Sequence, residues 1–243
     1  MIKIGDTLLL GLLYLAMLAP FIVLFILIFK PKNIRPLLLF MLFVMISILF
    51  LAGTPKFIGI PGARWNWTGK IASILAMLVC VRLSGISWKD SGLSFSFKKN
   101  WWIFFGIALA YYAVNRYLEY KGPLPDHYSA ETIAYQATMP GLEEEPWFRG
   151  LFLLTLNQYF GRPFRIGKLH FGPALILTSI LFGIVHGVET NNLHIYFHFG
   201  QMTGPLISGL IWGLVTEATG NIWPAVFLHN SSNTINYLLG VFK

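Results

Sequence analysis

The chain is organised around the stretch GLEEEPWFRG (residues 141–150), which runs directly into the apolar sequence LFLLTL (residues 151–156). Three carboxylates and one guanidinium therefore stand at the head of an apolar run. The chain around them is 56% hydrophobic and only 12% charged. Ionisable groups are expensive in hydrocarbon, so those found beside membrane-spanning runs usually mark function. We therefore ask which other polar side chains the fold brings to this acidic stretch.

The composition predicts an integral membrane protein. A soluble domain carries about a quarter charged residues, whereas this chain of 243 residues carries 12% and has a mean hydropathy of +0.64. Its length leaves room for about eight helical spans of about 20 residues each. We therefore expect an all-α fold: one transmembrane domain over residues 1–243, built as a bundle of about eight transmembrane helices, with the motifs at about 141–236.

The apolar runs and the polar turns between them place the expected helices. The expected ranges are about 7–29, 37–52, 70–86, 101–119, 141–160, 173–187, 195–217 and 223–241. The connection 120–140 is the longest polar stretch and is expected to hold a short interfacial helix near 129–138. Basic turns at 30–35, 89–99 and 162–168 alternate with less basic connections, which predicts cytoplasmic basic turns and outer termini.

The charge and the cysteine count exclude other classes of function. The formal net charge is +8, but the basic residues lie mostly between apolar runs, where anionic lipid headgroups attract them. We expect the lipid bilayer, and no nucleic acid, as a partner. Cys80 is the only cysteine, so no intramolecular disulfide is possible, and its apolar surroundings predict simple packing.

The acidic stretch contains a predicted ion pair. Glu145 and Arg149 are four residues apart on one helix face and can pair. Glu144 is rotated by about 100° from Glu145 around the helix axis, so a pair between Glu145 and Arg149 leaves Glu144 as the free carboxylate. The alternative is an acidic first turn that stabilises the helix dipole, with Pro146 tolerated there and one structural ion pair. That alternative explains Glu143 well, but not an ion pair beside a bilayer-spanning run.

Two later segments supply further polar side chains. The sequence FGIVH (residues 182–186) ends a short apolar run with His186, and HNSSN (residues 229–233) lies inside the last one. His229, Asn233 and Asn236 share one helix face, which must look into the bundle because polar groups in lipid need partners. The alternative is a structural histidine and interhelical hydrogen bonds without chemistry.

Together these residues predict hydrolysis of an acyl bond. A buried carboxylate can act as a general base on water, and an imidazole can share that role. A second imidazole and an amide can donate to a developing oxyanion. Alternatively, Glu144, His186 and His229 bind zinc and leave one position open for water. His194 and His198 are also four apart, but interfacial histidines explain them better than a metal pair does.

Three motifs in this order resemble those of the CAAX-processing and bacteriocin-processing (CPBP, or Abi) intramembrane endopeptidases. They are Glu144-Glu145-x-x-x-Arg149, Phe182-x-x-x-His186 and His229-x-x-x-Asn233. The resemblance covers about residues 141–236, while the first four helices fit only in number and hydrophobicity. Pro146, inside the first motif, fits the family pattern less well.

The resemblance implies eight helices and a peptidase site inside the membrane. Glu144 would activate water with help from His186, and His229 and Asn233 would stabilise the oxyanion. The supporting residues would be Glu145, Arg149 and Phe182. Family members are often labelled metallopeptidases, yet this glutamate mechanism requires no cofactor, with zinc as the alternative. The expected substrate is a peptide or membrane protein, and the expected location is the plasma membrane of a prokaryote.

Two other classes of function use the same polar groups. One is a non-catalytic immunity or scaffold protein that binds a peptide in the cavity. The other is an ion or proton transporter, which the lack of an evident internal repeat disfavours.

Small residues also recur every four positions in the expected sixth and seventh helices, and we interpret this spacing as close helix packing. They are Ser179, Gly183, Gly187, Gly200, Gly204, Ser208, Gly209 and Gly213.

Overall fold

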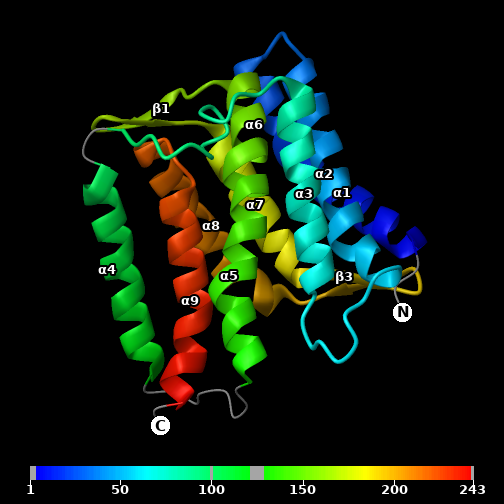
Figure 1. The fold of residues 1–243 in the computed structure, drawn as a ribbon. Helices are drawn as coiled ribbons and strands as arrows, with labels where there is room; N and C mark the ends of the chain where they lie inside the picture. The colour runs from blue at the N-terminus through cyan, green and yellow to red at the C-terminus, as the bar shows by residue number, and fades with distance from the viewer. Residues whose placement is uncertain (1–3, 99–100, 121–128, 242–243) are drawn as a thin grey trace.

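The structure, a computed structural model, describes residues 4–98, 101–120 and 129–241. These residues are mostly helical, as predicted (Figure 1). The helices are α1 (Ile4–Phe29), α2 (Arg35–Gly53), α3 (Trp67–Ser84), α4 (Trp101–Tyr120), α5 (Ala130–Glu145), α6 (Leu153–Phe160), α7 (Pro173–Gly187), α8 (Phe199–Thr219) and α9 (Trp223–Val241). A 3-10 turn, η1 (Thr54–Lys56), follows α2, and a π-helical turn, η2 (Pro146–Phe152), joins α5 to α6.

Three of these helices are long and apolar enough to cross a membrane by length and composition. They are α1, α2 and α3. Two further apolar helices are shorter, namely Trp101–Val114 within α4 and Pro173–Gly187, which is α7. These findings support membrane insertion, but they do not confirm the finer prediction of about eight transmembrane helices.

The acidic stretch lies in the middle of a helical segment, whereas the sequence analysis placed it at a helix start. The helix expected at 141–160 begins at Ala130, and the connection expected at 120–140 contributes its residues 130–140 to α5. Ser129 caps α5 by accepting a hydrogen bond from the Thr132 amide, which fits the preference for serine at the N-cap. Pro140 lies inside the helix, where packing of α5 against α9 outweighs its missing donor.

Two antiparallel hairpins replace stretches that were expected as turns. Strands β1 (Phe164–Ile166) and β2 (Leu169–Phe171) form one, and β3 (Val188–Asn191) and β4 (His194–Phe197) form the other. The helix expected at 195–217 consequently begins at Phe199. His194 lies in β4, and His198 is the N-cap of α8 without a side-chain capping bond.

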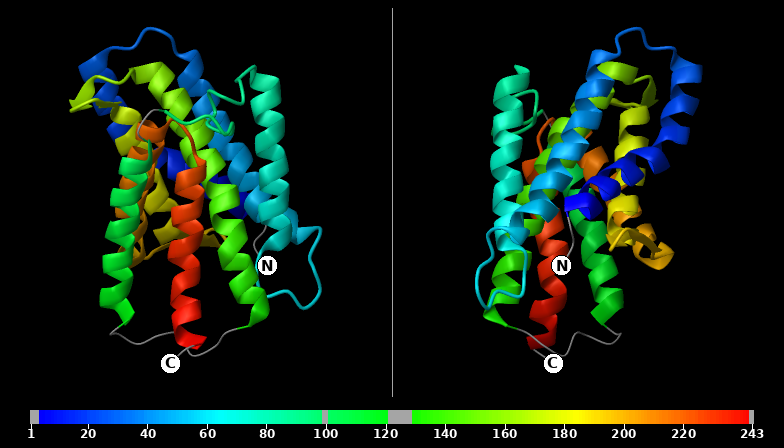
Figure 2. Two further views of the ribbon diagram at one scale, coloured as in Figure 1. Left: turned by 60° about the vertical axis from the view of Figure 1, so that its left-hand side comes forward. Right: turned by 90° about the vertical axis from the view of Figure 1, so that its right-hand side faces the viewer.

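The helices are arranged so that the basic turns lie together. In Figure 1 the connections α1–α2, α3–α4 and α6–α7 lie at the upper end of the molecule, while β3 lies near the lower end. Helices α4, α9 and α5 stand side by side, as both Figure 1 and Figure 2 show. The alternation of basic and less basic connections in the sequence therefore corresponds to two ends of the bundle.

The small residues of α7 and α8 pack closely at only some of their positions. A Cβ on Gly187 would lie 2.1 Å from Met202 Cγ, and one on Gly209 would lie 3.1 Å from the Ser179 Cα. A Cβ on Gly200 or Gly204 would meet nothing within 4 Å. The prediction of packing is therefore wrong for these two glycines, because α8 turns this part of its surface away from α7.

Candidate active site

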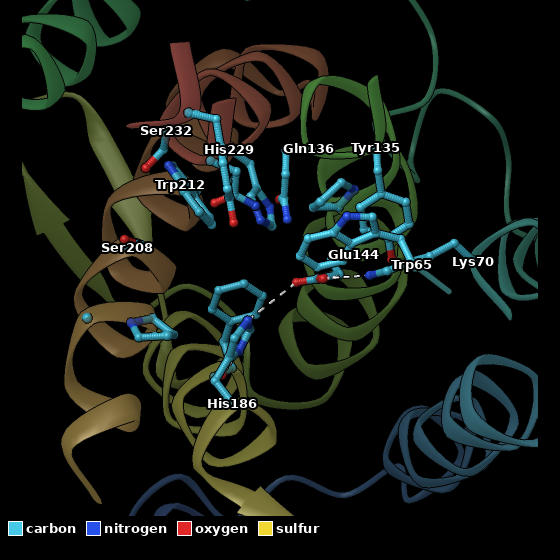
Figure 3. Close-up of a pocket in the computed structure, with 16 residues that line it drawn as sticks. Trp65, Lys70, Tyr135, Gln136, Glu144, His186, Ser208, Trp212, His229 and Ser232 are labelled. Atoms are coloured by element: carbon cyan, nitrogen blue, oxygen red, sulfur yellow. Dashed lines mark hydrogen bonds and ion pairs between the residues drawn. The ribbon is translucent and has the colours of Figure 1, made fainter. Parts of the chain in front are cut away.

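A cavity of about 600 Å³ lies among α3, α5, α7, α8 and α9 (Figure 3). All four residues predicted as catalytic line it: Glu144, His186, His229 and Asn233. The other lining residues are Trp65, Lys70, Tyr135, Gln136, Pro140, Phe182, Gly204, Pro205, Ser208, Trp212, Ser232 and Tyr237. Segments far apart in the sequence therefore assemble one mixed polar and aromatic cavity.

The first carboxylate of the motif is paired. Lys70 Nζ, from the first turn of α3, donates to Glu144 Oε1 at 2.6 Å. The prediction that Glu144 is a free carboxylate is therefore wrong. It considered only the partners within one helix, whereas Lys70 reaches Glu144 from 74 residues away in the sequence. The second oxygen, Oε2, is buried and has no hydrogen-bond partner among the described residues.

His186 faces that second oxygen. Its Nε2 lies 3.8 Å from Glu144 Oε2, which is too long for a direct hydrogen bond. The other ring nitrogen, Nδ1, lies 2.7 Å from the carbonyl oxygen of Phe182. Because a carbonyl only accepts, Nδ1 must carry the proton, and in a neutral ring Nε2 is then an acceptor. Two acceptors thus face each other across a gap.

The second carboxylate forms the predicted pair with Arg149. Arg149 Nε lies 3.1 Å from Glu145 Oε2, and both side chains are buried. His229 Nδ1 from α9 lies 2.8 Å from Glu145 Oε1. Glu145 therefore links the first motif to the last, a contact that the sequence analysis did not predict. Because this carboxylate engages Nδ1, Nε2 is the ring nitrogen of His229 that is left to face the cavity.

Aromatic rings surround this ion pair. The Arg149 guanidinium carbon lies 4.6 Å from the centre of the Phe182 ring, a distance suited to a cation–π contact. Trp212 from α8 stacks on the His229 ring, with 4.3 Å between centroids and 19° between planes. Phe182 also contacts the rings of His186 and Trp212. The aromatic residue of the second motif therefore packs against side chains of η2, α8 and α9.

Glu143, which directly precedes the two glutamates of the first motif, is buried at the boundary of α3 and α5. It accepts a hydrogen bond from Lys70 Nζ at 2.6 Å and one from Ser73 Oγ at 2.7 Å. The alternative explanation of Glu143 as a first-turn residue is wrong, because α5 begins 13 residues earlier, at Ala130. Glu143 instead holds α3 against α5.

The polar side chains of α9 divide between the cavity and packing. His229, Ser232 and Asn233 line the cavity. Asn230 accepts from the Gly141 amide at 2.7 Å and donates to the Thr138 carbonyl at 3.1 Å, so it joins α9 to α5. The side chain of Asn236 lies outside the described part of the structure. The predicted shared face is thus observed for His229 and Asn233.

A second, more apolar cavity of about 160 Å³ adjoins the same two catalytic candidates. Glu144 and His186 line both cavities. The other walls of the smaller one come from α1, α2, α5, η2 and α7: Leu10, Tyr14, Val44, Ser47, Ile48, Leu51, Ala52, Glu143, Trp147, Phe148, Phe152, Leu181 and Val185. The Glu144–His186 gap therefore separates a polar space from an apolar one.

The alternative of a zinc site at Glu144, His186 and His229 stays a prediction. Among the described residues, no group of three or more His, Cys, Asp or Glu side chains is placed to hold a metal ion. Lys70 engages Glu144 Oε1 and Glu145 engages His229 Nδ1, so Glu144 Oε2, His186 Nε2 and His229 Nε2 are the atoms of these residues that would hold a zinc ion.

These observations identify the protein as a helical membrane protein in which a cluster of carboxylates and imidazoles faces an internal cavity. Residues 128–235 match the family model described as Rce1-like, type II CAAX prenyl endopeptidase Rce1-like. This match confirms the predicted resemblance to the CPBP intramembrane proteases, and it supports a peptidase that is integral to the membrane. No curated protein and no solved structure matches the chain.

Sequence reasoning missed two residues that complete the site. Trp212 carried no signal beyond an aromatic residue in an apolar run. Lys70 did carry one, because it precedes a run of mostly apolar residues and lies three residues before Ser73 on the same helix face. A lysine at such a position needs a carboxylate partner, and the chain offers three in residues 143–145.

Proposed function

We propose that this protein is an intramembrane endopeptidase that hydrolyses a peptide bond of a membrane-associated protein or peptide. The observation that carries the proposal is the 3.8 Å gap between Glu144 Oε2 and His186 Nε2. Two facing acceptors are satisfied together by one water molecule that donates a hydrogen to each. Water held there is activated by a carboxylate and an imidazole, as general base catalysis requires.

In the proposed reaction Glu144 removes a proton from this water, and the oxygen attacks the scissile carbonyl carbon. The C–O bond forms as the carbonyl electrons move to the oxygen, which gives a tetrahedral oxyanion. The proton then passes to the leaving amine as the C–N bond breaks. No external oxidant, reductant or cofactor is needed, and His186 keeps the water in line through Nε2.

The oxyanion is stabilised from α9 in this proposal. The side-chain amide of Asn233 lines the cavity and can donate a hydrogen bond. His229 can donate from Nε2 only when its ring carries both protons, which is also the form that makes an ion pair with Glu145. Glu145, Arg149 and Phe182 support this arrangement by fixing the His229 ring.

The two cavities suggest how a substrate lies. The larger cavity, with its polar and aromatic walls, suits an extended peptide backbone. The smaller apolar cavity of about 160 Å³ suits one large apolar side chain beside the scissile bond, since a cavity of about 150 Å³ holds benzene. We therefore expect cleavage next to an apolar residue. The partners in this proposal are the lipid bilayer and the substrate, without nucleic acid.

The proposal also includes the membrane topology. Beyond α1, α2 and α3, the helices α4, α5 with α6, α7, α8 and α9 complete a bundle of about eight spans in the plasma membrane of a prokaryote. The buried ionisable residues of α3, α5 and α9 support this topology, because such residues face the bundle interior when they occur in spans.

The test is cleavage of membrane-associated peptides by the purified protein in liposomes, followed by mass spectrometry. We expect cleavage by the parent and none by Glu144→Gln or His186→Ala, with unchanged thermal unfolding. Glu189→Gln, in the exposed part of β3, is the control and should retain activity. Cleavage by well-folded Glu144→Gln at the parent rate would reject the proposal, and peptide binding without cleavage by the parent would favour the scaffold alternative.

A further inference from the structure

Lys70 belongs to the site although it lies outside residues 128–235, which carry the family match. Its side chain is only 8% exposed. Its Nζ lies 2.6 Å from Glu143 Oε2 and 2.6 Å from Glu144 Oε1 (Figure 3 shows the second contact). A single ammonium thus bridges two successive carboxylates from another helix.

This ammonium is itself held in place by a chain of hydrogen bonds. Trp147 Nε1 donates to Ser73 Oγ at 2.9 Å, and Ser73 Oγ donates to Glu143 Oε1 at 2.7 Å. Glu143 then holds Lys70 through its other oxygen. Lysine side chains lose much rotamer freedom when ordered, so a fixed carboxylate is needed to keep this one aimed at Glu144.

We infer that Lys70 is a positioning residue for the proposed peptidase reaction: anchored by Glu143, it holds Glu144 Oε1 so that Oε2 faces His186. This inference rests on the proposed function. Lys70 contacts the base and not the reacting atoms. Its contribution comes through geometry, where a misplacement of about 1 Å can cost about 100-fold in rate.

The charges around Glu144 support this role. The charged and titratable groups that interact with Glu144 are Lys70 from α3, Glu143 and Tyr135 from α5, Arg149 from η2, His186 from α7 and His229 from α9. Arg149 is committed to Glu145. Lys70 is therefore the cation that Glu143 and Glu144 share, and without it two adjacent carboxylates would repel each other.

The experiment compares Lys70→Ala, Lys70→Arg and Ser73→Ala in the full-length protein in liposomes. We expect Lys70→Ala to lower kcat by about 10- to 100-fold with little change in KM. Lys70→Arg should keep part of the kcat that Lys70→Ala loses, and ethylammonium added to Lys70→Ala should restore part of it. A purely structural role would allow neither result. Ser73→Ala, which removes one anchor of Glu143 and keeps every charge, should lower kcat to a smaller extent.

The matched control is Arg82→Ala, an exposed cation on the same helix, and it should keep the parent kcat. Parent kcat in folded Lys70→Ala would overturn the inference and leave the proposed function intact. If Lys70→Ala does not fold, an unchanged kcat in both Lys70→Arg and Ser73→Ala would overturn it equally.

A readout independent of activity separates this inference from the proposed function. A hydrophobic carbodiimide modifies protonated carboxyl groups, so Glu144 should be labelled faintly in the parent and strongly in Lys70→Ala, as mass spectrometry of peptides will show. Equal labelling of both proteins would overturn the inference. Absence of cleavage by the parent would reject the proposed function, while the labelling result would still decide the role of Lys70.

Discussion

Two carboxylates of this chain, the partly buried Glu144 and the buried Glu217, are used in opposite ways. Glu217 in α8 accepts from Asn157 Nδ2 at 2.5 Å through one oxygen and from Arg162 Nε at 2.8 Å through the other. Glu144 has one oxygen on Lys70 and the other without a hydrogen-bond partner among the described residues. Only Glu144 lines a cavity next to an imidazole. A buried carboxylate is therefore informative about function when part of its hydrogen-bonding capacity is left over.

The surroundings of Glu217 and Glu144 also differ. The Glu217 cluster joins α6, α8 and the basic turn after α6, and Lys98 from another basic connection donates to the Glu217 carbonyl. It closes the end of the bundle where the basic turns gather. The Glu144 cluster joins α3, α5 and α7 beside open space. The first arrangement serves stability, and the second leaves room for a substrate.

After the loss of cleavage expected for Glu144→Gln and His186→Ala, the largest effect on activity that we predict concerns Asn233. Asn233→Ala should lower kcat by about 100- to 1,000-fold, because an oxyanion donor is lost, with little change in the unfolding temperature. Asn230→Ala on the same helix is the control. It loses bonds to Gly141 and Thr138, so it should reduce stability more than kcat. Equal kcat values for the two variants would contradict the division of α9 into cavity and packing residues.

Shortening the Glu144 side chain should have the next largest effect on activity. Glu144→Asp withdraws the carboxylate from Lys70 and His186, and we expect a loss of about 100-fold in kcat/KM. Glu217→Asp makes the same change in the other cluster and should alter thermal stability instead. Steady-state kinetics and thermal unfolding of both variants check this contrast, which fails if Glu144→Asp is as active as the parent.

Filling the apolar cavity should change substrate preference more than turnover. Ser47→Phe places a ring among the walls of the 160 Å³ cavity. We expect KM to rise by roughly 10-fold for peptides with a large apolar residue beside the scissile bond, in line with about 1–3 kcal/mol for a changed pocket contact. Leu49→Phe, on the exposed surface of α2, is the control. An unchanged ranking of peptides would place the substrate side chain elsewhere.

The smallest effect on activity should come from Glu217→Gln. The variant weakens charged hydrogen bonds to Asn157 and Arg162, so the free energy of unfolding should fall by about 1–3 kcal/mol. The kcat of the folded protein should stay close to that of the parent. Differential scanning calorimetry in detergent measures the stability, and peptide cleavage measures kcat. A large loss of kcat without loss of stability would show that the two clusters are coupled.

Much of the helical fold could be predicted because apolar runs and short polar turns set the limits of α1, α2, α7 and α9 closely. The beginning of α5 could not, since Pro140 and Gly141 indicate a helix start. Gly141 is helical because its backbone approaches α9, where a Cβ would lie 2.8 Å from the Val226 carbonyl oxygen. Such packing between helices distant in sequence is not visible in local patterns.

For the site, spacing alone predicted the Glu145–Arg149 pair, because the two residues are neighbours on one helix. It could not assign partners between helices. His229 was expected near Glu144 and contacts Glu145, and no partner was predicted for Lys70. Long-range pairing depends on how α3, α5 and α9 are rotated, and the apolar pattern of a nearly uniform membrane helix specifies rotation poorly.

The π-helical turn Pro146–Phe152 has a consequence for how sequences of this type vary. A π turn often accommodates one residue more than regular winding would need, and such turns occur frequently at functional sites. A deletion of one residue here, with regular winding restored, would leave the later side chains of α6 close to their present rotation, because the wider turn has already absorbed the extra residue. The turn can therefore lose one residue without reorienting α6, whereas a deletion of one residue inside the regular part of α6 would rotate every later side chain by about 100°.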